Sequence, residues 1–321
     1  MSRNLITTVV LFVWLAVFPV VYGEAPATQP VGEVSARRVL IFSVDGLRPD
    51  IMLRAKAPVL RSLMAGGVFT CWAQTTDVAI TLPSHVSMLT GLSPAKHGIS
   101  WNDAQPVPAY PKVNTLFDIA HERGLSTGMA AGKTKFETFA RPGSIDFAAY
   151  APREIHNGQM LSTIWTDQTV TDRAVEIIRA HQPRVMFIHL PDVDTAGHTK
   201  GWGSVAQLEA IEAADSQIGR VLATLDELKL SAQTLVIVSA DHGGSSTSHG
   251  RDDLRSHFIP WIARGPGVIQ NHDLTLDHDL RVHTEDTFAV ACDFLGLDLP
   301  ADIDGKPIPQ IYGQRPTTAP K

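Results

Sequence analysis

The chain has 321 residues, of which 44% are hydrophobic and 19% are charged. This composition is that of a globular protein, and the length allows one large α/β domain or two smaller domains. The formal net charge of -6 gives no electrostatic basis for binding a nucleic-acid polymer, which excludes that class of protein. An anionic substrate would therefore have to be attracted by charges at the site itself.

The N-terminal segment has the pattern of a secretory signal peptide. Arg3 precedes an apolar run over residues 5–21, and small residues follow it. We therefore predict a cleaved signal peptide over residues 1–23 and a secreted or periplasmic protein without stable membrane insertion. The alternative is an uncleaved membrane anchor, because the run is at the lower edge of the length that spans a bilayer. Residues 24–37, which are small, polar and proline-containing, are predicted to be a flexible linker.

From residue 38 onward, strand-like and helix-like segments alternate, which predicts an α/β fold with a mostly parallel sheet and helices on both of its faces. The predicted strands cover residues 39–44, 68–74, 125–131, 145–150, 184–190, 234–240 and 258–263. The predicted helices cover residues 56–66, 84–91, 113–123, 166–181, 204–228 and 284–295. No linker divides residues 38–313, which are predicted to form one domain. Residues 314–321, rich in proline and threonine, are predicted to be a disordered tail.

The two cysteines, Cys71 and Cys292, leave two possibilities open. An exported protein can pair its cysteines. The two cysteines are far apart in sequence, and nothing in their spacing predicts that they lie close together. Two buried free thiols are therefore the alternative to a disulfide. Their spacing does not match a zinc site built from cysteines.

Acidic residues lie just past the ends of three of the predicted strands, and two of them have a histidine nearby. Asp45 follows the first strand, Asp194 and His198 follow residues 185–190, and Asp241 and His242 follow residues 235–240. Ligands of open α/β sheets bind at the carboxyl ends of the strands, so these side chains are expected to meet at one edge. Three carboxylates there would repel one another without a cation, and carboxylates with imidazoles suit zinc or a similar ion. The pattern predicts a metal site, with two metals.

Thr81 lies just before the predicted helix over residues 84–91, and Pro83 suits the first turn of that helix. The backbone N–H groups and the dipole of a helix N-terminus favour an anion such as phosphate. A threonine hydroxyl beside a divalent cation can lose its proton and act as a nucleophile. A lone threonine here would more often only cap the helix. The surrounding motifs favour the catalytic role.

Six short motifs stand out along the chain: Val44-Asp45-Gly46-Leu47-Arg48, Thr81-Leu-Pro-Ser-His85, Thr90-Gly91-Leu-Ser-Pro-Ala-Lys-His-Gly98, Asp194-Thr-Ala-Gly-His198, Asp241-His242-Gly243 and His249-Gly250. Together they resemble the alkaline phosphatase superfamily and, within it, the type I phosphodiesterase / nucleotide pyrophosphatase family. They occur in the family's order and extend over most of residues 38–268.

The resemblance implies an alkaline-phosphatase-like fold and two zinc ions. One ion would be held by Asp45, Thr81, Asp241 and His242. The other would be held by Asp194, His198 and His249. Residues 38–313 would then be the catalytic domain of an exported hydrolase of phosphodiesters or nucleotide pyrophosphates, with Thr81 as nucleophile, a phospho-threonine intermediate and a small phosphate ester as substrate.

Two ligand positions have competitors. Asp192 competes with Asp194, and the spacing to His198 favours Asp194. His257 competes with His249, because some members of the superfamily take their last ligand from a histidine just before a strand. We favour His249. Three other histidines are expected to be structural: His85, His97 and His189.

Substrate contacts are expected from Ser84 and Lys133. Nucleotide pyrophosphatases usually carry asparagine where this chain has Ser84, whose hydroxyl can donate a shorter-reaching hydrogen bond. Lys133 and Lys135 can reach an anionic group, although such lysines are more often solvated. The same ligand set also fits a phosphomonoesterase, a phosphonate hydrolase or a phosphotransferase. The oligomeric state is not indicated by the sequence.

Overall fold

The computed structural model describes residues 36–157 and 159–313. The predicted signal peptide, nearly all of the predicted linker and the predicted tail lie outside these residues. Within the described ranges, no helix combines the length and the apolar character needed to span a bilayer.

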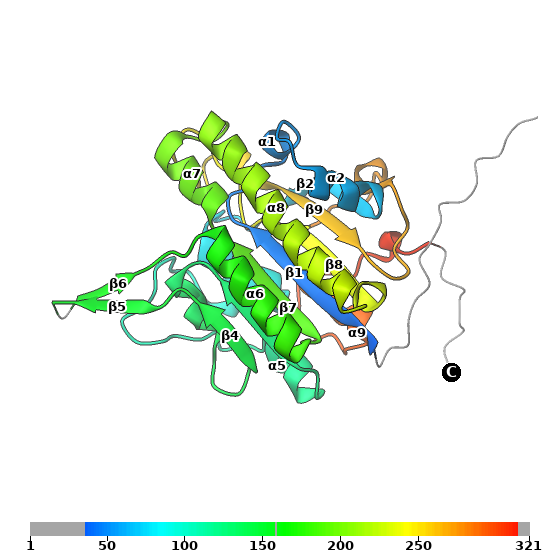
Figure 1. The fold of residues 1–321 in the computed structure, drawn as a ribbon, viewed down its shortest axis with the longest axis horizontal. Helices are drawn as coiled ribbons and strands as arrows, with labels where there is room; N and C mark the ends of the chain where they lie inside the picture. The colour runs from blue at the N-terminus through cyan, green and yellow to red at the C-terminus, as the bar shows by residue number, and fades with distance from the viewer. Residues whose placement is uncertain (1–35, 158, 314–321) are drawn as a thin grey trace, which may run out of the picture.

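In the described part of the chain, one eight-stranded sheet forms the centre of the molecule, with the order β10-β2-β9-β8-β1-β7-β3-β4 (Figure 1). The strands are β1 (Arg38–Val44), β2 (Val68–Gln74), β3 (Thr127–Ala131), β4 (Phe147–Tyr150), β7 (Val185–Leu190), β8 (Thr234–Ser239), β9 (Phe258–Arg264) and β10 (His272–Asp273). Strand β9 is antiparallel to both of its neighbours, and the other pairs are parallel. The predicted mostly parallel α/β fold is therefore confirmed.

Three adjacent strands at the middle of the sheet, β8, β1 and β7, are buried on both faces. Continuous runs of valine, isoleucine and leucine suit such strands because no residue of the strand faces water. The strands lie in parallel register, with Ser43 of β1 beside His189 of β7 and Ser239 of β8. Their carboxyl ends therefore reach one edge of the sheet together.

Helices cover both faces of this sheet. Figure 1 shows α6 and α8 in front of it, and α2, α7 and α1 pack against α8 on that side. On the other face α3 packs against α5 and α9. The helices are α1 (Pro49–Met52), α2 (Pro58–Ala65), α3 (Thr81–Thr90), α4 (Pro94–His97), α5 (Leu116–Glu122), α6 (Asp167–His181), α7 (Asp192–Lys200), α8 (Val205–Glu227) and α9 (Asp286–Leu295). The buried residues of α8 recur at helical spacing, which gives it one apolar stripe toward the sheet.

Some elements differ from the prediction. Helix α3 begins at Thr81 itself, so Thr81 is the first helical residue and its side chain makes no capping bond. Helix α7 and the hairpin of β5 (Arg153–His156) and β6 (Gln159–Ser162) were not predicted, because both are short and mainly polar. Cys71 and Cys292 are free thiols, of which Cys292 is buried and Cys71 is partly exposed, so the alternative of two buried free thiols holds fully only for Cys292.

Candidate two-metal site

Two groups of metal-ligand residues lie in the described part of the chain. The first contains Asp45, Asp241 and His242, and the second contains Asp194, His198 and His249. Within each group the candidate ligand atoms lie within 4.8 Å of one another. The three aspartates come from the ends of β1 and β8 and from the first turn of α7, which follows β7. The parallel register therefore brings together residues that are up to about two hundred positions apart.

The first group is completely enclosed by protein. The Nε2 atom of His242 lies 3.2 Å from Oδ2 of Asp241 and 3.5 Å from Oδ1 of Asp45, and all three side chains are 0% exposed. The hydroxyl of Thr81 approaches the same Nε2 atom at 3.4 Å. The first residue of α3 thus places its hydroxyl beside this group.

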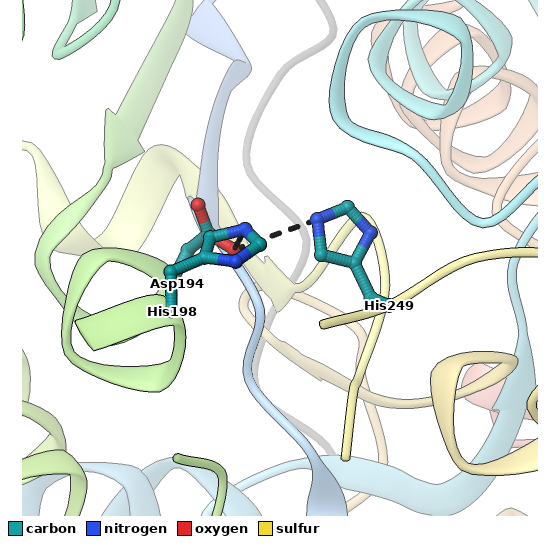
Figure 2. Close-up of side chains that lie close together, drawn as sticks. All are labelled: Asp194, His198 and His249. Carbon is teal, nitrogen blue, oxygen red and sulfur yellow. Dashed lines mark ion pairs between the residues drawn. The ribbon is translucent and has the colours of Figure 1, made fainter. Parts of the chain in front are cut away.

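The second group combines one helix with one loop, as Figure 2 shows. Asp194 and His198 are four residues apart on α7, so both face the same side of the helix. Oδ1 of Asp194 lies 3.3 Å from Nε2 of His198 and 3.8 Å from Nε2 of His249. His249 reaches this position from the loop after β8.

All three histidines of the two groups are oriented by a backbone carbonyl. The Nδ1–H of His242 donates to Gly243 O, that of His198 to Thr247 O and that of His249 to Ala79 O, each at 2.9 Å. A carbonyl oxygen only accepts hydrogen bonds, so Nδ1 carries the proton and the lone pair is on Nε2. Metal-binding histidines are commonly oriented in this way by their second nitrogen.

Each aspartate leaves one buried oxygen without a hydrogen-bond partner among the described residues. These atoms are Oδ1 of Asp45, Oδ1 of Asp194 and Oδ2 of Asp241. They are the same oxygens that face the Nε2 atoms of the histidines. Leaving such groups unpaired inside a protein is costly. A donor set of carboxylate oxygens and neutral imidazoles fits a divalent ion in each group.

The pKa values of the first group follow from its enclosure. Burial raises the pKa of Asp241 well above its usual range, and the nearby charge of Asp45 adds to this effect. Burial lowers the pKa of His242 to about 3, so its imidazole is neutral and can act as a ligand. The direction of the Asp241 shift indicates that this group needs further positive charge to keep all its carboxylates ionised.

Lys133 joins the two groups. Its Nζ atom lies 2.6 Å from Oδ2 of Asp45 and 2.6 Å from Oδ2 of Asp194. Burial opposes the charged form, but the two carboxylates outweigh it and raise the pKa of Lys133. Each of these aspartates therefore gives one oxygen to the ammonium and keeps the other oxygen for its own group. The sequence suggested a substrate contact for Lys133, and this bridging position was not predicted.

Two buried histidines outside the ligand groups also contact the site. Nε2 of His189 lies 2.8 Å from Oδ2 of Asp45. The Nδ1–H of His85 donates to Thr81 O at 2.7 Å, and its Nε2 accepts from the Ser43 hydroxyl at 2.8 Å. Both were expected to be structural. The place of His189 at the end of β7, and of His85 one helical turn after Thr81, could have signalled these contacts.

Several other candidate residues lie apart from the two groups. Ser84 is 0% exposed, and its hydroxyl is bonded to the hydroxyls of Thr75 and Thr76 at 3.1 and 2.9 Å. Asp192 accepts from Asp167 N at 2.9 Å, and Nε2 of His257 bonds Arg251 O at 2.8 Å.

At the N-terminus of α3, the N–H of Leu82 donates to the side chain of Asn102 at 2.9 Å. Pro83 has no N–H group, and the N–H of Ser84 makes the first intrahelical bond, to Ile80 O at 3.2 Å. The Asn102 side chain therefore takes one of the first-turn donors that an anion would otherwise use.

Comparison with known proteins identifies relatives over this same region. The sequence model of the family "Type I phosphodiesterase / nucleotide pyrophosphatase" matches residues 39–273. Ectonucleotide pyrophosphatase/phosphodiesterase family member 3 of Mus musculus is 24% identical over 237 residues, which are 70% of this chain and 27% of that protein. GPI ethanolamine phosphate transferase 1 of Schizosaccharomyces pombe is 24% identical over 341 residues, 92% of this chain and 35% of that protein. The chain thus spans about a quarter to a third of these relatives.

The fold is shared with solved structures. Murine ectonucleotide pyrophosphatase / phosphodiesterase 5 superposes with a TM-score of 0.65 at 16% sequence identity, covering 82% of this chain and 96% of that one. At this identity the likeness concerns the fold.

Proposed function

Because the chain belongs to the type I phosphodiesterase / nucleotide pyrophosphatase family, we propose that it is an exported two-metal hydrolase of phosphodiesters or nucleotide pyrophosphates. The observation that supports this most directly is the position of the Thr81 hydroxyl, 3.4 Å from Nε2 of His242 in a group of buried, unpaired carboxylate oxygens. The hydroxyl proposed as nucleophile therefore lies beside carboxylate oxygens that can bind a cation.

The first ion would be held by Asp45, Thr81, Asp241 and His242, and the second by Asp194, His198 and His249. Zinc is the proposed metal for both, since its usual ligands are carboxylates and imidazoles. Bound divalent ions supply charge stabilisation and lower the pKa of a nearby hydroxyl. The oriented Nε2 atoms and the single free oxygen of each aspartate are the chain's contribution to this site.

Thr81 is the proposed nucleophile. Its hydroxyl proton is released to solvent, and a bond forms between Oγ1 and phosphorus as the bond from phosphorus to the leaving oxygen breaks. The leaving oxygen takes a proton from water. A water molecule then attacks the phospho-threonine, which frees Thr81 and releases the phosphate product. Such reactions depend mainly on positioning and charge stabilisation.

Lys133 and Ser84 are the proposed substrate contacts. The ammonium of Lys133 lies between the two groups, where an oxygen of the phosphate would also be placed. Ser84 can take part only if its hydroxyl leaves Thr75 and Thr76. Phosphate recognition is therefore assigned mainly to Lys133 and the two metal positions.

Phosphotransfer is the second candidate function. The similarity to GPI ethanolamine phosphate transferase 1 extends over 92% of this chain. A transferase would use the same first step on Thr81, and an alcohol would replace water in the second. A phosphomonoesterase or a phosphonate hydrolase would also use the same residues.

The test compares hydrolysis of a bis-aryl phosphodiester with that of an aryl phosphomonoester by the zinc-loaded protein. We expect the diester to be preferred by more than about tenfold, and Thr81→Ala to lose at least about a thousandfold in rate while retaining its zinc. A preference for the monoester would make the enzyme a phosphatase. Equal rates for Thr81→Ala and the parent protein would overturn the assignment of Thr81.

Export is tested separately. The mass of the protein recovered from the periplasm or medium after expression of the full chain should correspond to loss of residues 1–23. Recovery of the intact chain in the membrane fraction would support the uncleaved anchor instead.

A further inference from the structure

The hairpin formed by β5 and β6 projects from the body of the molecule, at the left of Figure 1. Its base is attached to the segment that carries Lys133. Trp165 N donates to Gly132 O at 2.8 Å, and Thr134 N donates to Thr163 O at 3.2 Å. These two bonds flank the antiparallel pair of Lys133 and Ile164. The hairpin therefore begins directly beside the candidate metal site.

The pairing determines which side of the hairpin faces the site. Residues directly opposite each other in an antiparallel pair have their side chains on the same side, and the non-hydrogen-bonded pairs are the closer ones. Lys133 and Ile164 form such a pair, because the bonds run through their neighbours. The side chain of Lys133 reaches Asp45 and Asp194, so Ile164 lies on the same side. Ile164 is 56% exposed.

Apolar residues continue this side along the hairpin. Met160 and Ser162, the last residue of β6, share one side of the hairpin by strand alternation, Ile155 lies directly opposite Met160, and Ile164 follows two residues after Ser162. Arg153, which is also on this side, donates to Sδ of Met160 at 3.0 Å. Leu161 lies opposite Glu154 and therefore on the other side of the hairpin.

Large apolar side chains are exposed on the hairpin and on the loop that it contacts. Ile155 is 69% exposed, and Val107 is 74% exposed in the loop where Pro106 O accepts from Arg153 at 2.9 Å. Large apolar side chains that gather next to a polar site are typical of ligand contacts. Burial of such a side chain against an apolar group of a ligand is favourable.

We propose that Ile155, Met160 and Ile164 form an apolar face that binds the aryl or alkyl group of the phosphate ester. This inference rests on the proposed function, because the phosphate is placed at the site that Lys133 reaches. The face would make the enzyme select esters with an apolar organic group over esters with a small one. The three residues are then specificity-determining residues and take no part in bond cleavage.

The test uses two diesters with the same leaving group, phenyl 4-nitrophenyl phosphate and methyl 4-nitrophenyl phosphate. In the variant Ile155→Ser/Ile164→Ser, we expect kcat/KM for the phenyl ester to fall about tenfold and that for the methyl ester to change less than about twofold. Leu161→Ser is the matched control, since Leu161 is 46% exposed on the opposite side of the hairpin. It should leave both values unchanged.

An equal loss of kcat/KM for both esters in the double variant would overturn the inference, and so would the same selective loss in Leu161→Ser. A change of oligomeric state with unchanged kinetics would also overturn it, because the face would then be a protein contact. Thermal unfolding of each variant checks that the hairpin change leaves the fold intact.

If the protein cleaves neither diester, the proposed function is contradicted. The apolar face is then tested separately, by measuring the binding of two phosphonates. Calorimetry of the zinc-loaded protein with phenylphosphonate and methylphosphonate should show tighter binding of the phenyl compound, lost in the double variant. Equal binding of the two compounds by the parent protein would overturn the apolar face.

Discussion

His189 donates a hydrogen bond to Asp45, with 2.8 Å between Nε2 of the histidine and Oδ2 of the aspartate. The direction follows from the other ring nitrogen, because Nδ1 accepts from the N–H of Gly132 at 3.2 Å. His189 is 0% exposed and is fixed in this tautomer by the backbone. It holds one oxygen of Asp45 and leaves the other oxygen directed toward His242.

Replacement of His189 should weaken metal binding at the first group. For His189→Leu we expect a loss of about 10–100-fold in metal affinity and a lower kcat, since the oxygen of Asp45 is no longer held. His189→Gln keeps an N–H donor and should restore most of both. Chelator competition and kinetics on the same samples give the two values. Equal metal affinity in the Leu and Gln variants would show that packing, and not the hydrogen bond, is what matters.

Replacement of Lys133 should destabilise the metal-free protein. Lys133→Met leaves Asp45 and Asp194 without their shared ammonium, and removal of one partner from a buried ion pair typically costs about 3–5 kcal/mol. Urea unfolding of the chelator-treated protein measures this loss. Lys135→Met, two residues further along the segment, is the control and should cost less. If the two variants have the same free energy of unfolding and Lys133→Met differs only by a higher KM, then Lys133 contributes to substrate binding and not to stability.

The choice between His249 and His257 is decided by metal content. His249→Ala removes an Nε2 atom that faces Asp194, so we expect the loss of about one bound ion per chain. His257→Ala breaks only a bond to Arg251 O and should retain both ions. Elemental analysis after dialysis compares the two proteins. The opposite result would move the last ligand to the histidine before β9.

Glu285 should make stability depend on pH. Burial, together with the charges of Asp286 and Asp304, raises its pKa from 4.5 to about 7. Between these values the folded protein holds a proton that the unfolded chain has lost, so the contribution of Glu285 to stability falls as pH rises from about 4.5 to 7.

Glu285→Gln lacks this titration. Relative to the parent, its free energy of unfolding should increase by up to about 3 kcal/mol across that range and stay level above it. Urea unfolding at several pH values measures the difference. Glu209→Gln, at an exposed position of α8, controls for the loss of a glutamate. A difference that does not vary with pH would show that Glu285 is ionised in the folded protein.

The strand ends were predictable from sequence because buried parallel strands have continuous apolar runs, and Asp45, Asp194 and Asp241 lie within four residues of the ends of such runs. The position of Lys133 was not predictable from the sequence, because it depends on β3 lying next to β7 and on the base of the hairpin, which holds the backbone of Lys133. Strand order and pairing between distant segments are not encoded in local periodicity. Ser84 shows the same limit, because its partners Thr75 and Thr76 lie in the preceding loop, which has no regular pattern.

The ammonium shared by Asp45 and Asp194 also bears on the cost of keeping the site without ions. Two of the three buried aspartates of the site therefore have a counter-charge that the chain itself supplies. Among the described residues Asp241 has no such direct partner, and burial together with the charge of Asp45 raises its pKa. Without an ion, the electrostatic cost of burying the three carboxyl groups therefore falls mainly on Asp241.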